Sequence, residues 1–387
     1  MTKIANAVNS QFSIWQMYTL QSLQDTIFLL LYGGVAMLAL LSGIYLGLRR
    51  ANAIAPDVMP STPLRRWTAA FFIVAGLSHI WWYALGVHWL TDDRLVRNIT
   101  AVTLDHVALL PLVMAMLLRM LQDCHRRLWP WLLAQVPTAV IAIVGITKHD
   151  AGCMDIMHYW QILVIVTFIS YYIYALIRYS RWLRENYADL EHKEIWQSLF
   201  FVVILFVVYE IYSTNPGVMS REYLAQFNTI AIILFLLWRV ETLQQLEVKE
   251  EEEQQEPVME AAESGKQEAA FIPSNIGSML QKHCEKPHLY LQHDLTLSQL
   301  AEKIGTNRTY LGQYFTQQGI TYNAYVNGLR VAHFERLYEV AVTTMRPFTA
   351  QQLANESGFR SYSTFSSAFK QIKGQTVSEW IRQQGKL

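Results

Sequence analysis

Long apolar runs alternate with short polar connections over the first 240 residues. Seven such runs occur, at about 26–48, 67–90, 99–118, 128–147, 159–177, 195–213 and 223–238. Crossing about 30 Å of hydrocarbon takes about 20 helical residues, which most runs provide, the last with Arg239 reaching toward the headgroups. The pattern predicts seven transmembrane helices. So many nearly uncharged helices in succession argue against the buried helices of a large soluble protein.

Basic residues predict how these helices are oriented. They are concentrated after the first, third and fifth runs, as Arg49, Arg50, Arg65, Arg66, Arg119, Arg126, Arg127, Arg178, Arg181, Arg184 and Lys193. The other side has only Lys3, Arg94, Arg97, Lys148 and Arg221. Because Lys and Arg stay in the cytoplasm during insertion, we expect the N-terminus outside and the C-terminus in the cytoplasm. The N-terminal stretch has no pattern of a cleaved signal peptide.

Polar residues inside the runs are candidates for function, because an ionisable group in a bilayer usually faces a partner or a cavity. With the predicted orientation, many of them fall in the outer third of their helices, beside several aromatic residues that include Tyr159. They suggest a pocket, open to the outside, for an unknown small-molecule or membrane signal. The candidate ligand residues are Trp81, Trp82, His88, Asp105, His106, Trp160, Glu210 and Asn228. The alternative explanation is that the aromatic residues simply lie at the membrane interface and that the polar groups pair neighbouring helices. His79 is expected to be packed and hydrogen-bonded.

Three other functions of multi-helix membrane proteins find no support in the pattern. A retinal-binding rhodopsin needs a lysine in its last helix, and residues 223–238 contain none. Intramembrane metal hydrolases need clustered His and Asp ligands, commonly with two histidines one turn apart on one helix face. The spans contain no such pair, so no metal site and no cofactor are expected. Transporters tend to show matched helix breaks, whereas Pro111, Pro130 and Pro137 show no symmetry. We therefore do not expect an enzyme.

The composition changes after Trp238. Leu236, Val240 and Leu243 are spaced for a helix that continues beyond the membrane and pairs in a dimer. Glu250–Glu253 and Glu256 then make an acidic run without core-forming residues, which suggests a linker over residues 241–272 and a possible competitor of DNA. Residues 272–387 carry 12 Lys or Arg and 7 Asp or Glu. That excess of 12 − 7 = 5 positive charges favours a polyanionic partner.

One pattern of apolar, small and glycine residues occurs twice near the C-terminus. The first copy consists of Leu297, Leu300, Ala301, Ile304, Gly305, Leu311 and Phe315, and the second of Leu353, Ala354, Gly358, Phe359, Phe365 and Phe369. A helix-turn-helix unit needs a small residue where its helices cross and a glycine in its turn. The repeat therefore predicts two such units, with Asn307 or Thr306 capping a second helix. Between them, Tyr325, Leu329, Ala332 and Leu337 share the face of a connecting helix.

These residues resemble the AraC/XylS family of bacterial transcription regulators. The resemblance covers about residues 273–384 and depends on Leu300–Gly305, Tyr310, Leu311, Phe315, Gly319, Tyr325, Leu329, Arg330, Ala332, Leu353–Phe359, Phe365, Ala368–Lys370 and Gly374. Ser357 and Val377 depart from the family pattern, which has an apolar residue and a proline there. The resemblance implies that the two second helices enter successive major grooves about 34 Å apart. The candidate DNA-contacting residues are Arg308, Thr309, Gln313, Tyr362, Ser363, Ser367 and Lys370.

The sequence thus predicts an all-α protein, in which a seven-helix transmembrane bundle is followed by a soluble double helix-turn-helix domain. Residues 1–240 form a sensor domain, 241–272 an acidic helical or flexible linker, and 273–387 the DNA-binding domain. We expect a one-component transcription regulator of the bacterial inner membrane that binds double-stranded DNA and the lipid bilayer, as a homodimer. The alternatives are a membrane enzyme or transporter with a regulatory DNA-binding tail, and a scaffold that uses the helix-turn-helix units for protein contacts.

Overall fold

The computed structural model describes residues 26–56, 58, 61–86, 91–191, 193, 195, 204, 219–246 and 275–384. These residues divide into two compact units. The first comprises residues 1–177 and 195–248, and the second comprises residues 178–194 and 249–387. Among the described residues both units are helical, and an isolated β bridge pairs Tyr187 with Thr296.

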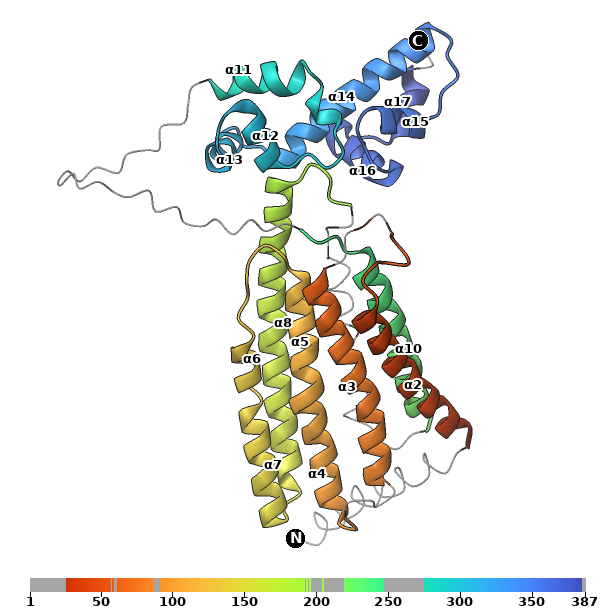
Figure 1. Ribbon diagram of the computed structural model, residues 1–387, viewed down its shortest axis with the longest axis vertical. Helices are drawn as coiled ribbons and strands as arrows, with labels where there is room; N and C mark the ends of the chain where they lie inside the picture. Colours follow the sequence, from red (N-terminus) through yellow and green to blue (C-terminus); the bar gives the residue numbers. More distant parts are fainter. Residues whose placement is uncertain are drawn as a thin grey trace, which may run out of the picture. The chain divides into compact units, whose positions relative to one another are not determined.

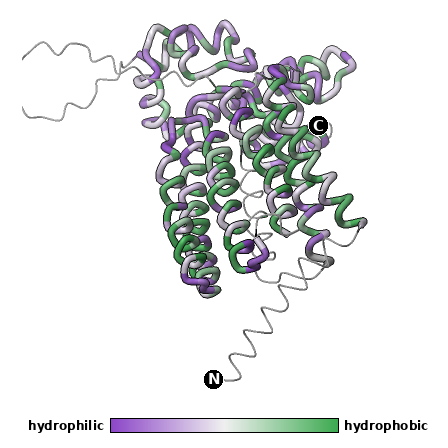
Figure 2. The backbone as a smooth tube through the Cα atoms, turned by 60° about the horizontal axis from the view of Figure 1, so that its bottom comes forward, coloured by the Kyte–Doolittle hydropathy of each residue, from purple (hydrophilic) through white to green (hydrophobic). Residues whose placement is uncertain are grey.

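Long apolar helices form the first unit (Figure 1). They are α2 (Thr26–Leu48), α3 (Thr62–Gly86), α4 (Arg94–Leu104), η1 (Asp105–Leu109), α5 (Leu110–Met120), α6 (Trp129–Leu133), α7 (Val136–Lys148), α8 (Gly152–Asn186) and α10 (Met219–Thr242). Hydrophobic residues run along most of these helices (Figure 2), and large apolar side chains such as Leu30, Ile143 and Leu163 are exposed. Such an apolar exterior suits a lipid environment.

Six stretches of the described chain are long and apolar enough to cross a membrane. They are Thr26–Leu48, Thr62–Gly86, Arg94–Met120, Trp129–Lys148, Gly152–Asn186 and Glu222–Thr242. They correspond to six of the seven predicted spans. The remaining prediction, 195–213, lies outside the described residues except for two isolated positions.

Small residues allow α2 and α3 to pack closely. A Cβ atom on Gly43 would lie 2.7 Å from Ile73 Cγ1, and one on Gly76 would lie 2.6 Å from Leu40 Cγ. Each glycine therefore receives an aliphatic side chain of the facing helix. Close approach at small residues is a common way for helices to associate in membranes, where lipid tails are as apolar as the helices themselves.

The helical conformation ends soon after the last described span. α10 stops at Thr242, and the side chain of Gln122 then holds the extended chain by donating to Gln244 O at 2.9 Å and accepting from Leu246 N at 2.8 Å. The predicted continuation of this helix is therefore wrong. The residues proposed as a dimer seam are instead buried within the first unit: Leu236, Val240 and Leu243.

Glu241 ties the end of α10 to the start of the bundle. Its carboxylate accepts from Tyr45 Oη at 2.7 Å and from the backbone N–H groups of Ala53 and Ile54 at 2.7 and 2.9 Å. Arg65 NH1 lies 3.8 Å away, and both side chains are buried. A buried carboxylate with this many partners is stable where it is and costly to displace.

The second unit contains the end of α8 and a C-terminal helical domain. The domain consists of α11 (Ile276–Leu280), η2 (Gln281–Glu285), η3 (Leu289–Leu291), α12 (Leu297–Ile304), α13 (Arg308–Gln317), α14 (Tyr322–Thr343), α15 (Ala350–Glu356), α16 (Tyr362–Lys373) and α17 (Val377–Gln384). It has two hydrophobic cores, one around α12 and α13 and one around α15 and α16.

The predicted connecting helix is confirmed as α14, but its buried face is not the predicted one. The residues that contribute buried side chains to the cores are Tyr322, Val326, Val331, Phe334 and Tyr338. The predicted residues Tyr325, Leu329 and Leu337 are only half buried, and Ala332 is exposed. The reason is that α14 serves two cores in succession, so no single stripe of one helix face is buried along its whole length.

Candidate nucleic-acid interface

The first helix-turn-helix unit is fixed by local hydrogen bonds. Thr296 caps α12 in a capping box with Gln299, and Gly305 ends the helix in the left-handed conformation at φ 75°. Asn307 then caps α13, accepting from Tyr310 N at 2.8 Å. The prediction that Gly305 makes the turn is confirmed, and of the two predicted caps Asn307 is the one used. A glycine avoids the steric cost that a Cβ atom meets at positive φ.

Three candidate DNA contacts lie on α13. Arg308 is its first residue and Thr309 is exposed beside it, while Leu311 and Phe315 face the core. Gln313 is half buried, and its Oε1 has no hydrogen-bond partner among the described residues. An amide oxygen of this kind can accept from an adenine N6 amino group while the amide nitrogen donates to N7.

The second unit repeats this framework. Thr349 caps α15 in a capping box with Gln352, and Ser361 caps α16 by accepting from Thr364 N. The departure from the family pattern at Ser357 is accommodated, because its fully buried hydroxyl donates to Ala354 O at 2.8 Å. Val377, the other departure, starts α17 and is buried in the second core. Both units are therefore complete.

The candidate residues on α16 fall into two groups. Ser363, Ser367 and Lys370 are exposed at spacings of four and three, on the face opposite the buried Phe365 and Phe369. Tyr362 is half buried instead, and its ring centroid lies 5.8 Å from that of Phe365. Its hydroxyl alone is therefore suited to a nucleic-acid contact, while its ring belongs to the core.

Arg330 joins the two units, a role that the sequence analysis did not assign. It is 1% exposed; its Nε donates to Tyr290 O at 2.7 Å, and its NH2 donates to Gln292 O at 2.7 Å and His293 O at 3.2 Å. Its guanidinium also lies 5.7 Å from the ring centroid of Phe359 in the second unit. One buried cation therefore fixes the first unit against the turn of the second, and with it the spacing between α13 and α16.

Two of the candidate ligand residues in the first unit are in direct contact. Asp105 Oδ1 accepts from Ser78 Oγ and Oδ2 from Trp82 Nε1, both at 2.6 Å. Asp105 begins η1, a π-helical turn just before Pro111. Proline cannot donate the i→i−4 hydrogen bond, and π-helical turns of this kind are frequent at functional sites.

The other candidate ligand residues are spread through the unit. Trp160 Nε1 donates to Ala134 O at 2.9 Å. Trp81, His106 and Asn228 are half buried on α3, η1 and α10, whereas His88 and Glu210 lie outside the described residues. His79 contacts Ala75 O at 2.9 Å and Gln226 Oε1 at 3.1 Å, which confirms the prediction that it is packed and hydrogen-bonded.

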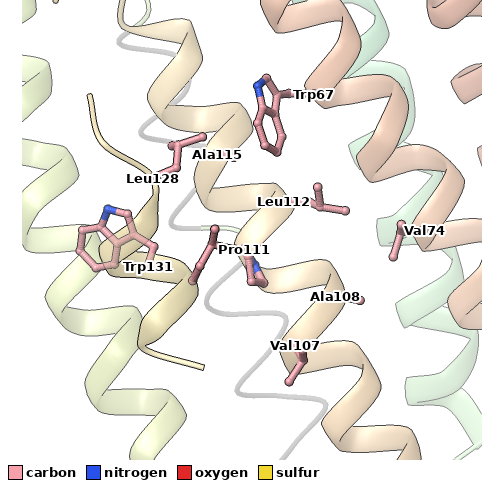
Figure 3. Close-up of a pocket in the computed structure, with 10 residues that line it drawn as sticks. Trp67, Val74, Val107, Ala108, Pro111, Leu112, Ala115, Leu128 and Trp131 are labelled. Carbon is pink, nitrogen blue, oxygen red and sulfur yellow. The ribbon is translucent and has the colours of Figure 1, made fainter. Parts of the chain in front are cut away.

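A cavity of about 270 Å³ occurs in the first unit, and its lining is almost entirely apolar (Figure 3). Trp67 and Val74 come from α3, Trp131 and Leu132 from α6, and Pro111 with its neighbours from η1 and α5. None of the candidate ligand residues lines this cavity. It offers shape and apolar surface to a ligand, but few hydrogen bonds that would orient one.

No metal-binding cluster of His, Cys, Asp or Glu occurs within the described ranges. The three cysteines are free thiols, with Cys124 exposed and both Cys153 and Cys284 buried. Burial raises the pKa of the Cys284 thiol to about 11, so it is protonated near neutral pH and behaves as a core residue.

Comparison with known proteins identifies the C-terminal domain. Residues 300–383 match the family model described as helix-turn-helix domain. Three relatives from Staphylococcus aureus, strains COL, MSSA476 and N315, are named uncharacterized HTH-type transcriptional regulators, and each is 28% identical over 98 residues. The match covers 25% of this chain and 12% of each relative. No solved structure matches the chain. Residues 300–383 are thus an AraC-type helix-turn-helix domain.

Proposed function

We propose that this protein is a membrane-bound one-component transcription regulator that binds promoter DNA sequence-specifically. The observation that carries the proposal is the pair of complete helix-turn-helix units joined by the buried Arg330, in a chain whose described residues also include six membrane-length apolar helices. Binding to successive major grooves requires a fixed spacing between the second helices of the two units, α13 and α16, which we call the reading helices. The names of the matched relatives support the same function.

In this proposal the two units contribute differently to DNA recognition. Arg308 and Gln313 can read purine edges bidentately in the major groove, with Thr309 beside them. Ser363 and Ser367 discriminate poorly between bases, and Lys370 suits a phosphate. The exposed arrangement of these three residues on α16 supports backbone contacts there. The first unit therefore supplies most of the sequence specificity.

The membrane unit receives the signal, which is external or carried by the membrane. Of the candidate ligand residues, Asp105 has the best support, because it is a carboxylate held by Ser78 and Trp82 at a π-helical turn. We propose that the N-terminus lies outside, that the C-terminal domain is cytoplasmic, and that the protein acts as a dimer in a bacterial inner membrane. Region 195–213 supplies the seventh span.

The test is DNA binding by the full chain in lipid nanodiscs. Selection from a random duplex pool should recover a sequence with two half-sites about one helical turn apart. The affinity should fall steeply with salt, since each neutralised phosphate contributes about −0.9 to the log–log slope. Binding that is absent, or insensitive to salt, would instead favour the scaffold alternative. Turnover or flux by the membrane unit in the same nanodiscs would favour an enzyme or transporter with a regulatory tail.

A further inference from the structure

The segment that follows the body of α8 packs against the DNA-binding domain inside the second unit. We call residues 186–191 and 193 the docking loop. Asn323 Nδ2, on the first turn of α14, donates to the backbone oxygens of Tyr187 at 3.2 Å and Ala188 at 2.7 Å. Ala188 is 1% exposed and belongs to the core of the first helix-turn-helix unit. The loop therefore completes that core.

Backbone pairing fixes the register of the docking loop. Tyr187 forms an antiparallel bridge with Thr296, the residue that caps α12. Next to it, Ala188 N donates to Leu295 O at 3.3 Å. Moving the loop would leave these backbone groups without hydrogen bonds, and a buried backbone group without a partner costs free energy. Backbone pairing therefore holds a segment in one position more firmly than side-chain contacts alone.

Further contacts of the loop reach the starts of both reading helices. Arg308, the first residue of α13, donates from Nε to Asn186 Oδ1 at 2.9 Å. Thr364, on the first turn of α16, donates from Oγ1 to Glu191 Oε2 at 3.4 Å. In helix-turn-helix proteins the N-terminal residues of the second helix meet the base edges. The docking loop thus engages Arg308, a candidate DNA contact, and the first turn of α16.

One carboxylate of the loop, that of Asp189, also engages a cation beside α16. Arg360, which precedes the cap Ser361, has its Nε 3.6 Å from Asp189 Oδ2. Asp294 of the DNA-binding domain pairs with the same guanidinium and with Lys193 Nζ. A guanidinium held by carboxylates is unavailable to a phosphate, which it would bind by the same charge-assisted geometry.

The buried ion pairs that involve the docking loop are weak. Asp189 and Lys193 are 3% and 2% exposed, yet their ion pairs, at 3.6 and 3.7 Å, are longer than hydrogen bonds. Burial accordingly lowers the pKa of Lys193, although Asp189 and Asp294 act in the opposite direction. An ion pair without hydrogen bonds offsets only part of the free-energy cost of burying its two charges. DNA can therefore compete with these contacts and displace the loop.

We propose that the docking loop is an internal competitor of DNA, which engages Arg308 at the start of α13 and Thr364 at the start of α16 and must leave before the domain binds its operator. The inference rests on the proposed function and adds its regulation. α8 is one continuous helix from Gly152 to Asn186, so the loop directly follows a membrane-length segment. A signal that moves or strains α8 shifts the equilibrium between the docked and released states.

A disulfide between the bridge partners tests the inference. Directly opposed residues of an antiparallel pair have Cα atoms about 4.5–5.5 Å apart, a separation that suits a disulfide. The protein is the full chain with Tyr187→Cys and Thr296→Cys, in a Cys124→Ser background that removes the exposed native thiol. It is reconstituted in nanodiscs and titrated with a mixed-sequence duplex of about 30 base pairs, enough for successive turns of the major groove.

The oxidised protein should bind this duplex at least about 10-fold more weakly than the same protein after reduction, in the usual range of allosteric coupling. The reduced form is the matched control for the loss of the Thr296 cap. A disulfide that fails to form would overturn the inference, because the loop would then not be docked. So would a disulfide that forms quantitatively and leaves the DNA affinity unchanged.

A second pair of variants separates this inference from the proposed function. Asp189→Asn with Glu191→Gln should tighten duplex binding by about 10-fold relative to the wild-type chain. Glu302→Gln with Glu339→Gln removes two exposed carboxylates from α12 and α14 and should change the affinity far less. If both double variants changed the DNA affinity equally, the change would be explained by net charge alone. That outcome would contradict a loop that competes with DNA. If no variant binds DNA in either redox state, the proposed function fails instead.

Discussion

The two helix-turn-helix units share one framework but differ at the turn and on the reading surface. Gly305 in the first unit faces open space, whereas a Cβ atom on Gly358 in the second would lie 2.8 Å from Leu291 Cα. The first reading helix carries Arg308 and Gln313, and the second exposes serines. The second unit is therefore positioned by its contact with the first, and in the proposed function the first unit carries the side chains suited to distinguishing bases.

Arg330→Met should break this arrangement most severely. The substitution removes the cation and leaves the carbonyl oxygens of Tyr290, Gln292 and His293, the first of them in a buried residue, without their donor. We expect a loss of about 3–5 kcal/mol in the free energy of unfolding of the DNA-binding domain. Native-state hydrogen exchange of the full chain in nanodiscs measures it. Arg346→Met, which removes only an exposed ion pair with Glu356, should cost less than about 1 kcal/mol.

Alanine at the two turn glycines should distinguish the units directly. Gly305→Ala meets only the cost of a Cβ atom at positive φ, about 1–2 kcal/mol. Gly358→Ala, at φ 93°, adds a collision with the backbone of Leu291 and should cost about 3 kcal/mol or more. The same exchange experiment reports both values. Equal losses would mean that the second turn is not pressed against the first unit.

Substitutions on the reading helices should separate specificity from anchoring. Gln313→Ala should weaken binding to the selected operator by about 1–3 kcal/mol and relax the preference at one base pair. Ser367→Ala should cost less than about 1 kcal/mol and leave the sequence preference intact, because a serine hydroxyl discriminates poorly. Competition titrations with single-base operator variants measure both effects. A larger loss of discrimination from Ser367→Ala would reverse the assignment.

The smallest expected effect is a dependence of stability on pH. Burial, helped by Arg336 and His288, lowers the pKa of His333 from its usual 6.5. Below pH 6.5 the unfolded chain therefore binds more protons than the folded domain, so stability should fall as the pH is lowered from about 7 to 5. Thermal unfolding at several pH values, with His333→Gln as the control, measures this contribution. A slope that is identical in the variant would assign the pH dependence to other groups.

The sequence predicted those features that depend on nearby residues. The capping by Asn307 and the turn at Gly305 follow from the preferences of single residues and their neighbours. The six candidate membrane spans among the described residues follow from their length and apolar composition alone. Asp105 and Trp82 were assigned to one site, and they are in contact, because a carboxylate inside a membrane-length helix normally pairs with a nearby group.

Features that depend on distant residues could not be predicted. The partners of Arg330 lie 37 to 40 positions away, and Asn186 is 122 positions from Arg308. No periodicity connects such pairs. The prediction that the helix continues beyond Thr242 was wrong for the same reason. Gln122, which follows α5 and is distant in sequence, holds the chain there through hydrogen bonds to Gln244 and Leu246. Where two structures are locally possible, tertiary contacts choose between them.

The central claim is that the DNA-binding domain reaches chromosomal DNA while the chain stays in the membrane. Reporter fusions after Leu387 test it most directly, with green fluorescent protein, which fluoresces only in the cytoplasm, and alkaline phosphatase, which is active only outside it. The account predicts membrane-bound fluorescence and no phosphatase activity. Active phosphatase without fluorescence would place the domain on the wrong side of the membrane and contradict the account.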